Sequence, residues 1–577
     1  MTDMRRTLLW VVFIMSLVFL YDGWNKHNGR PTLFGAPISE PVASAPAAGS
    51  SAAASAGVPA AASGMAGATA LPAAPAAAAS AASGEAVNVE TDLFKATIDS
   101  TGATLTHLEL KTYPDAIDPD KPVVLFDQSA ARHYLAQTGF INPAPGAAPL
   151  PRHLSPFSVQ PGERSLKDGA NEVVVRFESP EIGGAKLVKT YTFKRGDYII
   201  GVRHELTNVS GAPMTPQVYL QLLRDGRPPE GQSTSMFSST GFTYTGPALY
   251  NDATKFKKIE PAEIDKRGAS PYKVEGAASD GWIAMIQHHF VSAWLVPAGK
   301  PRDFVTNKVD NDYTVAMVQS LGTLEPGATT AFQTSLYAGP QDEKKLGALE
   351  PGLELVKDYG RVTVLAKPMF WLLDQLHSLL GNWGWAIIAL VVLLKIAFYW
   401  LNASAYRSQA KMRAVNPRIM EMRERMKDKP QEMQQEMMRI YREEKINPLG
   451  GCLPIVVQMP FFIALYWVLL ASVEMRGAPW MGWVTDLSKP DSLFGLVPYF
   501  HMPVGPLPIL MTLSSVLQVA LGPKAPDPVQ ARMMWIMPLA FSFMFFYFPS
   551  GLVLYWLTNN LLSIAQQWFI NKRLGVS

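Results

Sequence analysis

The sequence predicts a multi-domain membrane protein, in which a six-span α-helical part carries one large all-β domain outside the membrane. Three observations lead to this fold class. An apolar run follows two arginines at the N-terminus, long uncharged stretches recur after Trp383, and β-rich runs separated by turn residues fill much of the region between. With a formal net charge of +3, the chain gives no reason to expect nucleic acid as a direct partner.

The first element is a transmembrane anchor at residues 1–24. Arg5 and Arg6 precede an apolar run at 7–21, which is how a signal peptide begins. Asp-Gly-Trp-Asn follows at 22–25, in place of the small residues of a cleavage site. We therefore expect an uncleaved signal anchor whose N-terminus lies in the cytoplasm.

A linker and a β-domain follow the anchor. Residues 25–86 are rich in Ala, Pro and Ser and carry no charge between 41 and 84, a composition typical of a flexible tether. Residues 87–345 are predicted to form an antiparallel sandwich of many short strands. Its β-rich runs include Glu172–Phe177, Lys186–Phe193, Tyr198–Leu206 and Trp282–Val296.

Residues 346–382 connect the β-domain to the membrane part. Apolar side chains between Met369 and Leu380 recur at helical spacing, with Asp374 and His377 on the other face. Beside a membrane entry, this pattern predicts an amphipathic helix that lies in the interface. A helix packed on the sandwich is the alternative interpretation.

Five further spans make up residues 383–577. They are Trp383–Leu401, Cys452–Ser472, Val504–Leu521 and two spans within Met533–Ile570, which Phe548-Pro-Ser-Gly551 interrupts. The last run has 38 residues; at about 1.5 Å per residue it measures roughly 57 Å, near two bilayer cores. The lone Cys452 excludes an intramolecular disulfide and is interpreted as a small buried residue of a membrane helix.

The charges of the loops predict the topology. Eleven Lys or Arg lie between residues 402 and 450, and further cations occur at Lys524, Arg532 and the Lys572-Arg573 tail. Basic loops of inner-membrane proteins stay in the cytoplasm. Both termini are therefore expected in the cytoplasm, with the β-domain in the periplasm, in a multi-pass protein of the bacterial inner membrane.

The loop at 403–445 is predicted to be a cytoplasmic helical hairpin. Its apolar residues repeat at intervals of three and four, and Lys429-Pro430 separates the two helices. The seam residues are Met412, Val415, Ile419, Met422, Met426, Met433, Met437 and Ile440. The methionines favour a surface that adapts to varied apolar partners. A plain coiled-coil seam is the alternative.

Lys395 is the most informative residue of the spans. A lysine near the middle of a spanning helix costs about 2.5–3.5 kcal/mol on insertion scales, so its ammonium group should face protein or water. The other spans hold no acidic residue to pair with it, but they do hold polar ones: Gln458, Gln518, Thr558, Asn559, Ser563, Gln566 and Gln567. These residues favour a hydrated groove. Two alternatives stay open, namely that Lys395 snorkels to the interface and that the polar side chains form interhelical hydrogen bonds.

Motifs for catalysis are absent from the sequence. It contains no GxxxxGK[ST], HExxH or GxSxG motif and no cysteine pair, so we expect no ATP motor, enzyme activity, metal site or cofactor. The adjacent His288 and His289 are expected to point to opposite faces of one strand. A solute transporter, built on inverted repeats, and a membrane-anchored carbohydrate enzyme, built on an acid–base pair in the sandwich, are the alternative functions.

Four motifs resemble those of the YidC/Oxa/Alb family of membrane protein insertases, in its long Gram-negative form. They are Asn382-Trp-Gly, Asn447-Pro-Leu-Gly-Gly-Cys452, Gln458-Met-Pro-Phe-Phe462 and Phe548-Pro-Ser-Gly-Leu-Val-Leu-Tyr555. The resemblance implies a periplasmic β-supersandwich and a five-helix insertase core with a groove open to the cytoplasm and to lipid. It also implies that nascent membrane proteins are inserted and helped to fold there, alone or with the Sec translocon. The ribosome is a further implied partner.

The resemblance also assigns residues to the groove. The expected groove residues are Lys395, Gln458, Met459, Phe462, Tyr555, Trp556 and Asn559. Lys395 stands where the family usually has arginine, which keeps the positive charge but loses bidentate recognition of carboxylates. Val391 stands in place of a polar residue, which implies a drier groove. The short Lys572-Arg573 tail argues against ribosome docking through the C-terminus.

Overall fold

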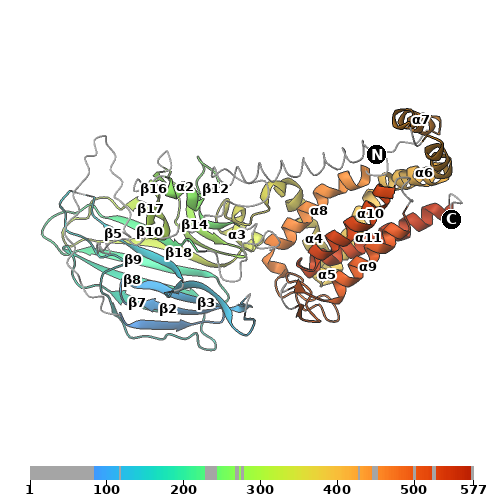
Figure 1. Ribbon diagram of the computed structural model, residues 1–577. Coiled ribbons are helices and arrows are strands. Elements are labelled where there is room, and N and C mark those ends of the chain that lie inside the picture. Colours follow the sequence, from blue (N-terminus) through green and yellow to red (C-terminus); the bar gives the residue numbers. More distant parts are fainter. Residues whose placement is uncertain are drawn as a thin grey trace, which may run out of the picture. The chain divides into compact units, whose positions relative to one another are not determined.

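The computed structural model describes residues 84–573, apart from 116–117, 131, 144, 228–243, 267–271, 274–277, 427–428, 445–452, 498–501 and 523–527. The anchor expected at 1–24, nearly all of the linker expected at 25–86, and Cys452 lie outside the described residues. The described chain divides into two compact units, a β-rich one up to Lys357 and a helical one from Asp358 onward (Figure 1). Each unit is described by itself.

The β-rich unit consists of two nine-stranded antiparallel sheets. In spatial order, the first sheet contains β1 (Ala86–Glu90), β2 (Phe94–Asp99), β3 (Thr104–Pro114), β4 (Pro122–Gln128), β5 (His133–Ile141), β10 (Gln217–Asp225), β17 (Asp312–Ser320), β16 (Arg302–Val309) and β13 (Tyr272–Lys273). The second contains β12 (Lys257–Lys258), β11 (Thr245–Tyr250), β14 (Trp282–Gln287), β15 (Phe290–Leu295), β18 (Thr329–Pro340), β9 (Ile199–Asn208), β8 (Ala185–Lys194), β7 (Glu172–Glu178) and β6 (Ser158–Val159). Helices α2 (Pro261–Asp265), α3 (Glu343–Leu349) and η2 (Leu353–Val356) complete the unit.

Residues of both sheets share one hydrophobic core, so the predicted antiparallel sandwich is confirmed in outline. β8 shows why the sequence folds this way, because Leu187, Tyr191 and Phe193 alternate with exposed or half-buried residues and are all buried. One expectation is wrong. The run from Trp282 to Val296 is a hairpin of β14 and β15, and its turn holds His288 and His289. Their rings stack at 3.8 Å instead of pointing to opposite faces of one strand.

The helical unit contains eight helices of ten or more residues among its described residues. They are α4 (Thr363–Leu380), α5 (Trp383–Ala397), α6 (Tyr399–Arg425), α7 (Pro430–Glu443), α8 (Leu453–Ala471), α9 (Pro506–Ala520), α10 (Pro528–Phe545) and α11 (Ser550–Arg573). The short elements are η3 (Gly360–Val362), η5 (Val473–Met475), β19 (Leu496–Val497) and β20 (Met502–Pro503). Helix α11 packs against α5, α6, α8 and α9, and residues of α5, α8, α9 and α11 share one apolar core.

Helix α4 begins six residues before the predicted amphipathic segment. Its buried side chains, which include Met369, Phe370 and Leu373, belong to the core of the helical unit, where α4 packs against α5 and α8. Trp371 and Leu379 lie on the other side and are 63% and 81% exposed. The buried face is therefore used within the helical unit, which disfavours the alternative of a helix packed on the sandwich.

The predicted span at 383–401 is not one straight helix. α5 ends at Ala397, α6 begins at Tyr399, and the two axes differ by 65°. Phe398, at the break, packs its ring edge-on against Phe461 of α8, with ring centres 5.1 Å apart. Among the described residues, no single helix has the length and hydropathy of a membrane span. The bent pair has them jointly, and Val457–Ala471, Pro506–Ala520 and Arg532–Phe545 are shorter apolar helices.

The Asn-Trp-Gly motif fixes the start of α5. Asn382 Oδ1 accepts a hydrogen bond from Trp385 N (3.2 Å) and caps the helix, while its Nδ2 donates to the main-chain oxygens of Pro479 and Trp480. A Cβ atom at Gly384 would lie 2.2 Å from the Trp480 ring, so glycine allows the loop to approach this closely. The described part of the loop at 473–505 is therefore held against α5 at Pro479 and Trp480.

The same loop holds the start of α11. Ser550 N and Oγ both donate to the main-chain oxygen of Lys489 (2.8 and 2.7 Å), and Gly551 N donates to that of Leu487 (2.9 Å). These bonds occupy donors that the first turn of a helix leaves without an intrahelical partner. The motif Phe548-Pro-Ser-Gly is thereby explained as a turn bound by a loop that is distant in sequence.

In the β-rich unit, Lys189 lies on the core-facing side of β8. It is 1% exposed, and its Nζ donates to the main-chain oxygens of Gly102 (2.6 Å) and Thr138 (3.1 Å). Burial lowers the pKa of Lys189 to about 7. His204 is fully buried nearby, and burial together with the charge of Lys189 holds its pKa well below the usual range.

We predict that the β-rich unit loses stability as the pH falls, because burial favours the neutral forms of both side chains. The unfolded chain protonates Lys189 below pH 10.5 and the folded chain only near pH 7, so this loss accumulates between those values. His204 adds a further loss below pH 6.5. Lys189→Met removes two hydrogen bonds, but it should make the stability of the β-rich unit less dependent on pH between about pH 7 and 10.5. Lys186→Met, at an exposed site on β8, should leave this pH dependence unchanged.

The measurement is hydrogen exchange of the β8 and β9 amides in the full-length protein, corrected for the intrinsic effect of pH on exchange. The same pH dependence in Lys189→Met and in the unaltered chain would contradict the prediction.

Candidate functional site

A small cavity lies where the end of α5 meets α8 and α11. Its volume is about 10 Å³, room for roughly one water molecule. The residues that line it are Val391, Leu394, Lys395, Phe398, Gln458, Phe461, Tyr555 and Asn559. Four of these, Lys395, Gln458, Tyr555 and Asn559, are residues that the sequence predicted for the groove. Three helices that are far apart in the chain thus bring the predicted polar groups together.

Lys395 directs its ammonium group toward α11. Its Nζ donates to Ser563 Oγ (2.7 Å), and that hydroxyl donates onward to the main-chain oxygen of Asn559 (2.7 Å). Among the described residues, no carboxylate lies within ion-pair distance of Lys395. The ammonium group is half-buried and bonded to a neighbouring helix, which disfavours the snorkelling alternative.

Further amide groups lie on the helices next to this lysine. Gln458 Nε2 donates to Asn402 Oδ1 (3.1 Å), and Asn402 is only 3% exposed. The Nδ2 atom of Asn402 and both amide atoms of Gln566 are buried and have no hydrogen-bond partner among the described residues. Buried polar groups in proteins are almost always paired. Helices α6 and α11 therefore hold buried amide groups whose hydrogen-bonding capacity is not used among the described residues.

The aromatic residues of the predicted site form a group of their own. Phe462 of α8 packs edge-on against Trp556 (ring centres 4.6 Å apart) and lies near Tyr555 (6.1 Å). Met459, in contrast, is 40% exposed and stands one turn from Ile463, which is 38% exposed. Met459 thus lies on an outward apolar face of α8 and does not line the cavity.

Sequence reasoning missed several polar contacts. Asn402 and the bond from Lys395 to Ser563 were not anticipated, and neither was Asn560, whose Nδ2 donates to Ser514 Oγ (3.1 Å) and Ser515 Oγ (2.9 Å) of α9. The adjacent serines in an otherwise apolar helix were the available signal. On α11, therefore, Asn559 lines the cavity and Ser563 binds Lys395, while Asn560 forms the interhelical hydrogen bonds that the alternative interpretation expected.

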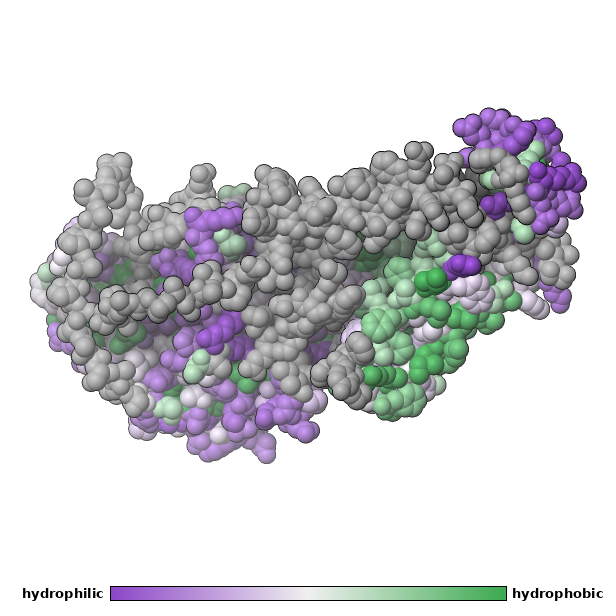
Figure 2. Space-filling view, viewed as in Figure 1, coloured by the Kyte–Doolittle hydropathy of each residue, from purple (hydrophilic) through white to green (hydrophobic). Residues whose placement is uncertain are grey.

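Apolar side chains cover the outside of the helical unit, where Figure 2 shows a broad hydrophobic surface. Those that are at least 40% exposed include Leu393 and Ile396 of α5, Leu510, Leu513 and Leu517 of α9, and Ile536, Met537, Leu539, Phe541 and Phe543 of α10. Exposed apolar side chains in such numbers are unusual for a soluble monomer and are typical of contact with lipid.

The hairpin of α6 and α7 is different, since its surface is hydrophilic in Figure 2. The seam that the sequence predicted is present: Val415, Ile419, Met422 and Ile440 are buried, and Met412, Met426, Met433 and Met437 pack against them.

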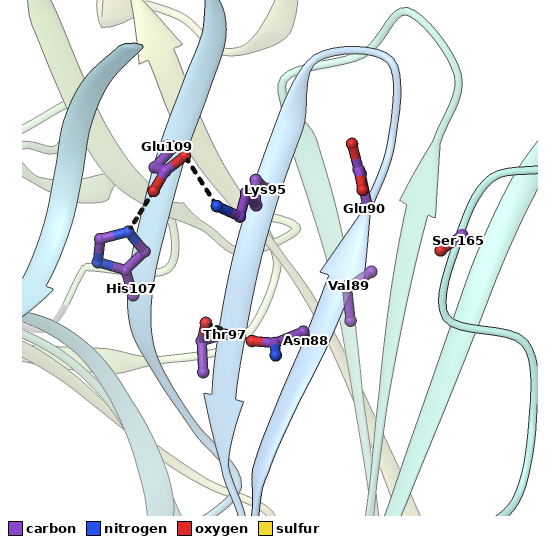
Figure 3. A pocket seen from close by; sticks show the side chains of 8 residues that line it. All are labelled: Asn88, Val89, Glu90, Lys95, Thr97, His107, Glu109 and Ser165. Atoms are coloured by element: carbon purple, nitrogen blue, oxygen red, sulfur yellow. Dashed lines mark hydrogen bonds and ion pairs between the residues drawn. The ribbon is translucent and has the colours of Figure 1, made fainter. Parts of the chain in front are cut away.

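A second cavity of about 370 Å³ lies on the β-rich unit (Figure 3). Strands β1, β2 and β3 supply most of its polar side chains. Glu109 contacts His107 Nε2 (3.0 Å) and Lys95 Nζ (3.6 Å), and Glu90 contacts Lys111 Nζ (2.8 Å). The two glutamates are thus held in ion pairs, an arrangement typical of a solvated sheet face.

Known proteins resemble this chain over nearly its whole length. The model for the YidC periplasmic domain matches residues 86–372, and the model for the 60Kd inner membrane protein matches residues 375–576. The chain is 49% identical to a membrane protein insertase YidC of Janthinobacterium sp. over 100% of both chains, and 51% identical to that of Cupriavidus necator over 99% and 98%. A crystal structure of active YidC insertase covers 84% of this chain and 94% of its own, at 17% identity and a TM-score of 0.38.

These matches define a class of inner-membrane proteins with a β-rich periplasmic domain and a helical C-terminal part. Within that class, the chain belongs to the YidC family of membrane protein insertases, as its motifs predicted.

We predict that the site beside Lys395 is in contact with water in the membrane-embedded protein, so that a cysteine placed there is reached by a water-soluble reagent. In a Cys452→Ser background, Asn559→Cys should react with a charged methanethiosulfonate several times faster than Leu557→Cys, because Asn559 lines the cavity and Leu557 is 9% exposed in the apolar core. The rates are measured in membranes with the full-length protein. Equal rates at the two positions would mean that the cavity is closed to water.

Proposed function

We propose that this protein inserts hydrophobic segments of nascent membrane proteins into the inner membrane, along a groove centred on Lys395. The observation that supports this function best is the lysine itself, half-buried, bonded to Ser563 and beside a cavity that three further polar side chains line, in a unit with an apolar exterior. A polar segment that enters bare hydrocarbon loses several kcal/mol for each unsatisfied backbone group. A polar site within the helices lowers that cost over part of the crossing.

In this proposal, Lys395 attracts acidic residues of the segment that crosses. Ion pairs are stronger where water is scarce. The ammonium group of lysine attracts a carboxylate without the fixed two-bond geometry of the arginine guanidinium. The unused amide capacity of Asn402 and Gln566 serves the polar backbone of the same segment. No step in this mechanism makes or breaks a covalent bond, and we propose that the protein is not an enzyme.

The apolar part of the client leaves sideways into lipid. Phe462, Tyr555 and Trp556 form an aromatic wall next to the cavity, and Met459 lies on the outward face of α8 beyond it. We propose that the client contacts these residues in passing, and that its own burial in lipid drives release.

We propose a membrane arrangement of six spans, made of the anchor at 1–24 and five helical segments at 383–577. The basic loops then lie in the cytoplasm with both termini, and the β-domain at 87–345, between the linker at 25–86 and the segment at 346–382, lies in the periplasm. In this arrangement, the hairpin at 403–445 projects into the cytoplasm. Its methionine-rich seam suits a surface that opens for varied clients, although a static coiled-coil seam has the same residues.

Among partners, we propose the Sec translocon and a role in assisting folding, on the strength of the family resemblance. For the ribosome, the C-terminal cations give little support. Lys572 Nζ lies over the Trp568 ring (5.2 Å) and Arg573 over the Phe569 ring (4.5 Å), so both are engaged within α11. Ribosome contact would then fall to other cytoplasmic cations, such as those of the hairpin.

We predict that Lys395 acts through its positive charge. Lys395→Arg should retain most insertion activity. Lys395→Ala should impair clients with acidic translocated segments most, and Lys395→Glu should be worse than alanine for these clients because it repels them. The measurement is protease protection of matched clients that differ only in translocated charge. Ser563→Ala, which leaves the charge but removes its bonded partner, should reduce insertion of acidic and neutral clients alike.

Equal activity of the arginine, alanine and glutamate variants on every client would show that Lys395 only reaches the interface. An equal loss of insertion activity for all clients would show that Lys395 supports the packing of the helices and does not distinguish clients by their charge.

A further inference from the structure

The segment that precedes α9 is uncharged and exposes large apolar side chains. Residues 492–523 include no Asp, Glu, Lys or Arg, although α9 begins only at Pro506. Leu493, Phe494 and Leu496 are 54%, 65% and 59% exposed. A solvated loop usually carries polar residues, so three neighbouring apolar side chains that face outward indicate a nonpolar surrounding. We refer to the described residues 493–497 and 502–504 as the ribbon.

The backbone of the ribbon is hydrogen-bonded within itself. β19 and β20 pair antiparallel, with Leu496 opposite Pro503 and Val497 opposite Met502. Beyond this pairing, Phe494 N donates to Val504 O (2.8 Å) and Val504 N donates to Gly495 O (3.0 Å). Because lipid offers no hydrogen-bond partners, backbone enters a bilayer only where its polar groups are paired internally. The described part of the ribbon largely meets this condition.

Asp491 fixes the ribbon to the start of α9. It is 7% exposed, and its Oδ2 accepts hydrogen bonds from Trp483 Nε1 (3.1 Å) and from Leu507 N in the first turn of α9 (2.8 Å). A Cβ atom at Gly505 would lie 2.0 Å from the Asp491 carboxyl carbon, so a glycine is required where the chain passes this group. The ribbon therefore keeps a fixed direction relative to α9.

Helix α9 alone is short for a membrane. Its 15 residues measure about 22 Å, against roughly 30 Å for a hydrocarbon core. Its exposed face consists of Ile509, Leu510, Leu513 and Leu517, and the apolar side chains of the ribbon precede this face directly in the chain. The missing depth is thus supplied by apolar residues that are not helical.

We propose that the ribbon lies in the outer leaflet of the membrane, at the boundary between headgroups and acyl chains, and completes the span that α9 begins. Lipid is the occupant of its apolar side. Trp483 lies in the 473–505 loop and is 39% exposed, and Trp385, which is 45% exposed, packs its ring edge-on against Trp480 of that loop. Both fit the aromatic residues that mark such boundaries. The inference rests on the membrane topology proposed above and does not depend on the groove at Lys395.

The test uses the full-length Cys452→Ser protein with one nitroxide label, reconstituted alone into phosphatidylethanolamine and phosphatidylglycerol vesicles. Labels at Phe494→Cys and Leu496→Cys are compared with one at Leu513→Cys on α9 and one at Glu163→Cys, whose side chain is 66% exposed on the β-rich unit. Paramagnetic relaxation by oxygen reports lipid, and relaxation by a water-soluble nickel complex reports water.

The ratio of oxygen to nickel relaxation at positions 494 and 496 should approach that at Leu513 and exceed that at Glu163 severalfold. A ratio equal to that at Glu163 would overturn the inference. A rise that occurs only when the Sec translocon is added to the vesicles would assign this face to a protein partner and would overturn it as well. The proposed function is tested separately by the insertion activity of the Lys395 variants. These substitutions should leave the ratio of oxygen to nickel relaxation at position 494 unchanged.

Discussion

A positive charge inside an apolar helical unit is the constraint on which the arrangement of the other helices depends. The ammonium group of Lys395 needs a polar partner, and Ser563 of α11 provides it by accepting from Nζ and donating to Asn559 O. This contact fixes the rotation of α11 about its axis. With Ser563 facing α5, Asn560 meets the serines of α9 and Tyr555 meets the aromatic side of α8. The same rotation of α11 thereby serves three helix interfaces.

The two ends of α5 have opposite properties, and the proposed function depends on this difference. At its start, Asn382 and Gly384 leave no space, since the 473–505 loop is hydrogen-bonded and packed against them. At its end, around Lys395, there is a cavity, and the amides of Asn402 and Gln566 have groups without a partner among the described residues. A helical unit that is sealed at one end and polar at the other suits a groove that opens to one side of the membrane only.

Much of the fold could be predicted because its patterns are local. Buried alternation in β8 and the seam of the hairpin follow from side-chain periodicity, which the sequence displays directly. Three features could not be predicted from the sequence, because each depends on packing between different elements: the bend at Phe398, the turn at His288 and the outward position of Met459. Lys395 could be recognised because a charged residue in an apolar helix is visible in the sequence. Asn402 was missed because no local pattern indicates its contact with Gln458.

The most direct test of the groove is photo-crosslinking to a stalled nascent membrane protein. A photoreactive amino acid is placed at Phe462 or Asn559, beside the cavity, and at Leu517, which is 47% exposed on the apolar face of α9. If clients pass along Lys395, the first two positions should crosslink strongly to the apolar segment of the client, and Leu517 should crosslink weakly. Crosslinks of equal yield at all three positions, or at Leu517 alone, would contradict a groove at this site.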